Sequence, residues 1–287
     1  MPEGDTIYRT ARTLNRALAG GKVKSFQTVL PKLARVDVDH GVVGRTVQRV
    51  EAQGKWLKMD FSGDLILLTH MLMSGSWHIY RPGEAWKRPR IDQRITIATE
   101  EFVAVAFKVP IAEFHTAATL ERRLRWLGPS ILAEELDEPA VLANLRGHAG
   151  AEVGAVLLNQ SVLAGIGNVF KSEVCFECDV NPFRQVNSLT IQEAACLVAT
   201  ARRFMLANVD VNSGDKIVTH GGMRRTTGLT NTEERLWVYH RSGKPCRRCG
   251  TKIERRKQMP DARVTFWCPS CQPRIKSGEK HLVASAD

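Results

Sequence analysis

Two cysteine pairs near the end of the chain constrain its fold more than any other feature of its 287 residues. Cys246 and Cys249 form one C-x2-C pair, Cys268 and Cys271 form another, and residues 250–267 separate them. Each pair can give two thiolates to one ion, and four thiolates close a tetrahedral zinc site with no open position. The spacing is typical of a zinc ribbon. The sequence therefore predicts one structural Zn2+ ion that holds a hairpin together.

The other cysteines predict no second metal site. The chain has seven cysteines and no secretory apolar core in its first twenty residues, so a disulfide framework is not expected. Cys175 and Cys178 also have C-x2-C spacing, but no further pair lies nearby, and we interpret them as buried apolar residues. Cys196 lies among apolar residues at helical spacing, and we predict a place in the core.

The N-terminal part of the chain predicts a helix followed by a β-sandwich. Apolar residues recur at helical spacing from Ile7 to Leu18, between Asp5 at the expected start and the glycine pair at 20–21. Short runs rich in β-branched and aromatic residues follow, separated by turn signals. These runs cover residues 22–29, 45–52, 55–61, 64–70, 75–80, 94–99 and 102–109.

From about residue 117 the apolar period becomes helical. We expect helices over 118–128, 138–147, 151–160 and 189–209, and the last should begin with a capping box of Thr190 and Glu193. Residues 212–232 are polar and rich in Gly, Thr and Arg, and predict a mobile loop. Strands are expected again over 235–240 and 263–268, and the last dozen residues are expected to be disordered.

A glycine turn lies between two of the helical segments. In the stretch LAGIGNVFKSE, Gly165 and Gly167 precede Asn168, which begins the second segment. Glycine allows a close backbone approach, and the N–H groups of a helix start can bind an anion. The pattern resembles the helix–two-turn–helix DNA-binding motif, although an ordinary interhelical turn has a similar sequence.

The net charge of the chain indicates which class of partner it could bind. The formal net charge is +11 and the isoelectric point is about 9.5. A basic surface of this size is either simply solvated or binds a polyanion such as DNA. The sequence has no run near the roughly 18 apolar residues that a membrane span needs, so we expect a cytoplasmic protein without a membrane partner.

The first residues after Met1 suggest a nucleophile. If Met1 is removed, Pro2 exposes a secondary amine, and a neutral amine attacking a sugar C1′ gives a covalent iminium. Glu3 can then act as a general acid–base on the sugar ring oxygen. The alternative is that both residues merely precede a helix, where Pro and Glu are common.

Four motifs in order carry a family resemblance: PEGDT at the start, GKWLKM at 54–59, LAGIGNVFKSE, and RVTFWCPSCQ in the four-cysteine region. Together they resemble the formamidopyrimidine-DNA glycosylase / endonuclease VIII family, from Pro2 to Gln272, and PEG is closer to the endonuclease VIII branch. The resemblance implies an α+β multidomain fold. Its expected parts are a catalytic N-terminal helix and β-sandwich over 1–118, a helix–two-turn–helix domain over 119–235, a zinc-finger hairpin over 236–274 and a disordered tail over 275–287.

The resemblance also implies the function and the site. The chain would be a base-excision-repair DNA glycosylase with AP lyase activity, acting as a monomer at the nucleoid on double-stranded DNA with damaged bases or abasic sites. Pro2 would be the Schiff-base nucleophile and Glu3 the proton donor, and strand cleavage would follow by β,δ-elimination. Further site residues would be Lys55 as a catalytic phosphate contact, Asn168 and Arg263 as the phosphate-holding pair, with Arg263 also counted as catalytic, and Leu72 and Met73 as wedges.

Several alternatives remain open at this stage. Leu72 and Met73 could instead end a core strand, and we assign His70 only a structural hydrogen bond. The loop at 211–235, where base recognition is expected, matches neither branch closely. Oxidised pyrimidines are the favoured substrates, oxidised purines such as 8-oxoguanine or formamidopyrimidine are the alternative, and a non-catalytic damaged-DNA binder could share the scaffold. A zinc-ribbon transcription factor would explain the cysteines but not the N-terminal motif.

Overall fold

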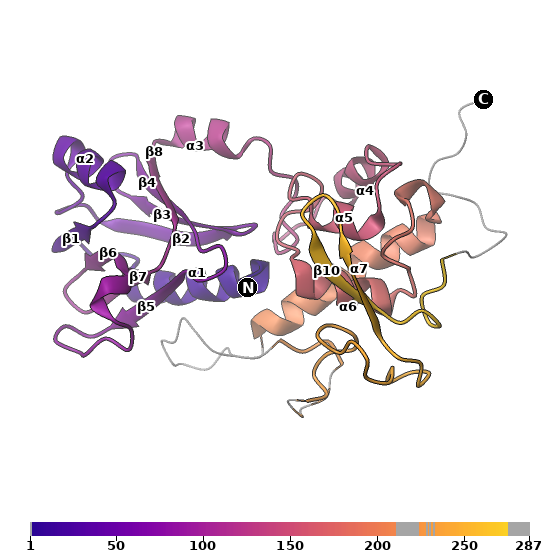
Figure 1. Cartoon of the computed structure of the whole chain (residues 1–287). Helices are drawn as coiled ribbons and strands as arrows, with labels where there is room; N and C mark the ends of the chain where they lie inside the picture. The colour runs from indigo at the N-terminus through magenta and orange to yellow at the C-terminus, as the bar shows by residue number, and fades with distance from the viewer. Residues whose placement is uncertain (1, 211–223, 228, 230, 232, 275–287) are drawn as a thin grey trace. The chain divides into compact units, whose positions relative to one another are not determined.

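A computed structural model describes residues 2–210, 224–227, 229, 231 and 233–274 (Figure 1). The predicted loop at 212–232 lies largely outside these residues, and the predicted tail at 275–287 lies wholly outside them. Contacts divide the described chain into two units, one ending at Trp126 and the other beginning at Leu127. No helix among the described residues is long and apolar enough to cross a membrane.

The first unit is a β-sandwich with a helix, which confirms the predicted fold class. Helix α1 (Gly4–Leu18) is followed by two four-stranded antiparallel sheets, in the orders β1-β6-β7-β5 and β2-β3-β4-β8 (Figure 1). The strands are β1 (Ser25–Thr28), β2 (Val47–Gln53), β3 (Trp56–Phe61), β4 (Leu65–His70), β5 (Ser76–Tyr80), β6 (Gln93–Ala98), β7 (Val103–Phe107) and β8 (Ile111–His115), with the short 3-10 helix η1 (Arg90–Asp92) before β6.

Helix α1 lies along β2 in the opposite direction. Its buried stripe, from Ile7 to Leu18, packs into the same apolar core as Leu57 and Trp77. The side chain of Asn15 accepts the backbone N–H of Val50 at 2.8 Å, and the loop after α1 hydrogen-bonds to the start of β2. The end of β2 therefore points toward the N-terminal half of α1.

One α-helix and one strand of this unit were not predicted. Helix α2 (Pro31–His40) buries only Leu33, so its sequence has no apolar stripe that could predict a helix. All five residues of β8 are half-buried, so the alternation that predicts a strand is missing there. Helix α3 (Ala117–Leu124) then closes the unit, within the predicted range 118–128 apart from its first residue.

The second unit is largely helical and confirms the predicted helix–two-turn–helix region. Its helices are α4 (Glu138–Arg146), α5 (Val153–Leu158), α6 (Asn168–Glu177) and α7 (Ile191–Asp210), with the short 3-10 helix η2 (Val186–Ser188) before α7. The capping box is present, since Thr190 N–H donates to Glu193 at 2.9 Å and Glu193 N–H donates to Thr190 at 3.0 Å. Helices α6 and α7 share a core that includes Phe170 and Leu197.

The cysteine prediction was wrong at one point. Cys178 and Cys196 form a disulfide with a Cα–Cα distance of 6.0 Å. Cys178 follows the last residue of α6 and Cys196 lies in the second turn of α7. The two residues are eighteen positions apart, and only the packing of α6 on α7 brings them together. Cys175 is a buried free thiol, as predicted.

The predicted strand at 235–240 was also wrong. Backbone N–H groups of this segment donate hydrogen bonds to a side chain and not to a neighbouring strand. The buried carboxylate of Glu173 on α6 accepts the N–H groups of Trp237, Val238 and Tyr239 at 2.8–2.9 Å, and the hydroxyl of Thr226 as well. Burial raises the pKa of Glu173, and these donors act against that rise. One carboxylate thus fixes the course of a segment that pairs with no strand in the described part of the chain.

The two strands near the C-terminus form the predicted hairpin. Strand β9 (Glu254–Gln258) pairs in antiparallel register with β10 (Arg263–Trp267). The hairpin packs on α6 through polar side chains, because Lys171 donates to Thr265 at 2.6 Å and Thr265 donates to Gln258 at 2.8 Å. This contact fixes the start of β10 close to the start of α6.

Candidate active site and metal centre

The chain begins directly before α1, with Pro2 half-buried and Glu3 fully buried. The backbone carbonyl of Glu3 accepts the N–H groups of Thr6 and Ile7 at 2.9 and 3.1 Å, so Glu3 occupies the N-cap position. Its side chain makes no capping hydrogen bond. A carboxylate that only favoured the helix start would contact these N–H groups. The Glu3 side chain is therefore buried without capping the helix.

Lys55 lies at the tip of the β2–β3 hairpin. Gly54 has φ of 60°, which is the conformation that a two-residue hairpin turn requires at its first position. Val50 lies beside Asn15, and three further strand residues extend about 10 Å. The eleven helix residues from Asn15 back to Gly4 extend about 17 Å in the same direction. The topology thus directs Lys55 toward the end of α1 that carries Pro2 and Glu3.

His70, which the sequence analysis set aside, lies near Lys55. It ends β4 opposite Trp56, and its Nδ1 accepts the backbone N–H of Leu72 at 3.1 Å. Burial, and then the nearby charge of Lys55, lower the pKa of His70 to about 4. The ring is therefore neutral at pH 7 with its proton on Nε2, where it can donate a hydrogen bond. Only the fold could show this, because the sequence gives no sign that Lys55 and His70 are neighbours.

We expect His70 to titrate with a pKa of about 4 in an NMR experiment on the folded protein. The unfolded value is about 6.5, so the unfolded state binds more protons between pH 6.5 and 4. The free energy of unfolding should therefore fall as the pH drops through this window. Lys55→Met should raise the His70 pKa, because it removes the nearby positive charge. A His70 resonance that titrated near pH 6.5 in both the unaltered protein and Lys55→Met would contradict the burial of His70 beside Lys55.

Leu72 and Met73 lie in the turn that follows β4. They are 43% and 61% exposed, whereas Met71 before them is 2% exposed. Gly75 closes the turn by donating its N–H to the carbonyl of Met71 at 2.8 Å, and a Cβ at Gly75 would lie 2.6 Å from that oxygen. The structure therefore places two large apolar side chains on a tight, exposed turn. The alternative, that Leu72 and Met73 end a core strand, does not hold.

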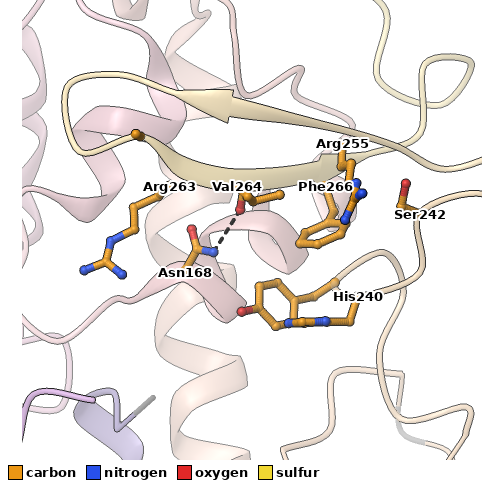
Figure 2. A pocket seen from close by; sticks show the side chains of 9 residues that line it. Asn168, His240, Ser242, Arg255, Arg263, Val264 and Phe266 are labelled. Carbon is orange, nitrogen blue, oxygen red and sulfur yellow. Dashed lines mark hydrogen bonds between the residues drawn. The ribbon is translucent and has the colours of Figure 1, made fainter.

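In the second unit, Asn168 and Arg263 line one cavity of about 600 Å³ (Figure 2). Asn168 is the first residue of α6, and Arg263 is the first residue of β10. The Asn168 amide donates one N–H to the carbonyl of Val264 at 2.8 Å, while its Oδ1 is buried and has no hydrogen-bond partner among the described residues. An amide carries two N–H donors. The second N–H and the Arg263 guanidinium together suit an anion.

The four predicted metal ligands form one cluster. The sulfur atoms of Cys246, Cys249, Cys268 and Cys271 all lie within 4.8 Å of one another. The Cys246–Cys271 and Cys249–Cys268 sulfur distances are 3.9 and 3.5 Å. A tetrahedron with Zn–S bonds of about 2.3 Å has edges of about 3.8 Å. The donor set and its spacing therefore fit a structural metal ion of the zinc type.

Comparison with known proteins identifies the family. Residues 1–110 match the formamidopyrimidine-DNA glycosylase N-terminal domain, residues 127–219 match the formamidopyrimidine-DNA glycosylase H2TH domain, and residues 243–274 match a zinc finger found in FPG and IleRS. A probable endonuclease 8 2 of Streptomyces coelicolor is 38% identical over 95% of this chain and 94% of its own length. The chain belongs to the formamidopyrimidine-DNA glycosylase family. This family of enzymes includes the endonuclease 8 relatives.

Two further relatives extend the comparison. A protein of Mycolicibacterium smegmatis named DNA-(apurinic or apyrimidinic site) lyase Nei2 is 33% identical over 95% of this chain and 99% of its own length. A Lactococcus lactis Fpg, solved in complex with DNA that contains an abasic site, has a TM-score of 0.78 and 22% identity over 94% of this chain and 99% of that chain. At that identity the structural match supports the family fold only.

Proposed function

We propose that this member of the family removes oxidised bases from DNA and then cleaves the strand at the abasic site. The observation that carries the proposal is Glu3, a fully buried carboxylate that follows Pro2 and does not cap its helix. The family match and the relative named as an abasic-site lyase support the same activity. We further propose one structural Zn2+ ion in the four-cysteine cluster.

The proposed reaction begins at the terminal amine. The nitrogen of Pro2, freed by removal of Met1, attacks the deoxyribose C1′, and the base leaves with the electron pair of its glycosidic bond and takes up a proton. Glu3 supplies a proton to the sugar ring oxygen as the ring opens. A secondary amine gives a permanently cationic iminium, which withdraws electrons from C2′. Loss of a C2′ proton then expels the 3′ phosphate, and a second elimination expels the 5′ phosphate, which leaves a phosphate on both sides of the gap.

The remaining site residues are proposed to hold the DNA. A base inside the stack cannot be reached, so its nucleotide must be flipped out at a cost of a few kcal/mol. Asn168 and Arg263 would bind a phosphate at the flipped nucleotide, and Lys55 would bind another, with His70 as a neutral donor beside it. Leu72 and Met73 would fill the gap left in the duplex, because large apolar side chains can wedge between base steps.

The substrates we propose are oxidised pyrimidines. The support is the PEG start of the chain and the 38% identity to a probable endonuclease 8 2. Excision from duplexes that each carry thymine glycol, 5-hydroxyuracil or 8-oxoguanine would rank the lesions. We expect the two pyrimidine lesions to be removed faster. A much faster removal of 8-oxoguanine opposite cytosine would exclude this assignment.

Borohydride trapping tests the proposed chemistry directly. We expect the purified protein, incubated with abasic-site DNA and sodium borohydride, to form a covalent adduct whose mass is that of the chain without Met1 plus the attached DNA fragment. The adduct peptide should carry the modification on Pro2. A protein that binds this DNA but gives no adduct would be a damaged-DNA binder, and an adduct on a lysine would reassign the nucleophile.

A further inference from the structure

The disulfide between Cys178 and Cys196 has no part in the proposed reaction. It joins the residue after α6 to the second turn of α7, eighteen positions later in the chain. A disulfide is unexpected in an enzyme that acts on DNA, because the cell compartments that hold DNA keep thiols reduced. Disulfides that form there are usually transient, and they are catalytic or redox-sensing. The proposed reaction uses no thiol, which leaves redox sensing as the role to examine.

The two sulfur atoms differ in their access to small thiols. Cys178 is 8% exposed and belongs to the apolar core of the helical unit, whereas Cys196 is half-buried at the edge of that core. A small thiolate can therefore attack the sulfur of Cys196 and expel Cys178 as the leaving thiolate. The Thr200 hydroxyl lies 3.5 Å from the Cys178 sulfur and 3.8 Å from the Cys196 sulfur. It can donate a hydrogen bond to either thiolate, which favours exchange in the folded protein.

The third cysteine of this region does not compete with the pair. Cys175 lies one turn before Cys178 and is fully buried in α6. Burial raises the pKa of its thiol to about 12. Only the thiolate form attacks a disulfide, and no small thiol can reach Cys175 in the core. The exchange is therefore confined to Cys178 and Cys196.

Helix α6 carries the groups that this bond would stabilise. Asn168 is its first residue, Glu173 in its middle binds the backbone of residues 237–239, and Cys178 follows its last residue, about 15 Å from Asn168. The apolar core that α6 shares with α7 also includes both cysteines or their contacts, so packing keeps the two thiols close when the bond is open. Reduction therefore leaves the fold in place and removes a cross-link that disfavours unfolding of the helix pair.

We propose that Cys178 and Cys196 are a reversible redox couple that stabilises the packing of α6 on α7 under oxidising conditions. The oxidant is a small disulfide such as glutathione disulfide. Exchange with the two thiols forms the Cys178–Cys196 bond, breaks the S–S bond of the oxidant and releases two glutathione thiols, and excess glutathione reverses the exchange. The inference rests on the proposed function, because conditions that oxidise DNA bases would then be those in which this enzyme is most stable.

Titration of the full-length protein with glutathione buffers tests the couple. After equilibration, free thiols are blocked with N-ethylmaleimide in denaturant and counted by mass spectrometry. The chain has seven cysteines, and five of them lie outside the disulfide. We expect the count to change from seven to five as the share of glutathione disulfide rises, with Cys178 and Cys196 as the unblocked pair. The oxidised form should melt about 5–10 °C higher, because the cross-link restricts the unfolded chain.

The double variant Cys178→Ala/Cys196→Ala is the matched control, because it keeps all four cysteines of the metal cluster. Its melting temperature should not depend on the glutathione ratio, whereas Cys175→Ala should keep the full response. A double variant that responds like the unaltered protein would assign the effect to the metal-cluster thiols and overturn the couple. A count that stays at seven in excess glutathione disulfide, or at five in excess glutathione, would overturn it as well. These counts on the unaltered protein decide the question even if the double variant does not fold.

Borohydride trapping separates failure of this inference from failure of the proposed function. Neither cysteine takes part in the adduct, so the protein should form it with abasic-site DNA at room temperature whether it was first oxidised or reduced. If the adduct forms and the melting temperature does not follow the thiol count, the redox couple is wrong and the enzyme assignment stands. If the melting temperature follows the thiol count and no adduct forms, the couple stands as a property of the fold and the proposed function is wrong.

Discussion

Replacement of Glu3 by glutamine is expected to lower base removal by about 10²- to 10⁴-fold, the usual contribution of a positioned general acid–base. The amide keeps the size of the buried side chain but cannot deliver the proton. Cleavage of a preformed abasic site should fall much less, because the base has already left. Single-turnover rates on a lesion duplex measure base removal, and rates on an abasic duplex measure strand cleavage.

Asp5→Asn is the control for this experiment. Asp5 is also a buried acid in the first turn of α1, but its carboxylate pairs with Arg9 at 3.7 Å on the same helix. We expect Asp5→Asn to keep base removal within about tenfold while it changes the melting temperature. Equal losses in the two variants would mean that the first turn of α1 is merely destabilised, and Glu3 would then lose its proposed role.

The sequence predicted well wherever a local pattern carries the structural information. The apolar stripe of α1, the capping box of Thr190 and Glu193, and the spacing of the four clustered cysteines each follow a local pattern in the sequence. Each is also confirmed by the structure. In these places the backbone period or the ligand geometry alone decides which residues are required.

The errors occurred where tertiary contacts override the local pattern. Residues 235–240 have the composition of a strand, but the Glu173 carboxylate binds their N–H groups from a helix more than sixty residues away in the sequence. Cys178 meets Cys196 only because α6 packs on α7. The low pKa of His70 likewise depends on burial at the end of β4 and on Lys55. No pattern within a single segment encodes these contacts.

The second large effect is expected at the metal cluster. Cys249→Ser should reduce bound zinc from one ion per chain to none and abolish tight DNA binding. Structural zinc contributes an apparent 10–16 kcal/mol in small fingers, about as much as the whole stability of a typical domain. The apolar cluster beneath the hairpin is small, with Phe176, Val238, Ile253 and Phe266 beside Cys246 and Cys268. Without the ion, this cluster cannot hold β9 and β10, and Arg263 loses its position.

Cys175→Ala provides the matched control for the loss of a thiol. Cys175 is buried in α6, and burial raises its thiol pKa to about 12, so it stays protonated and is a poor metal ligand. This variant should retain one zinc ion and its DNA affinity. Metal content by mass spectrometry and binding to abasic-site DNA would be measured on both proteins. A Cys249→Ser protein that stayed folded and bound DNA without metal would show that the hairpin is held by its packing on α6, through Lys171 and Thr265, and not by the ion.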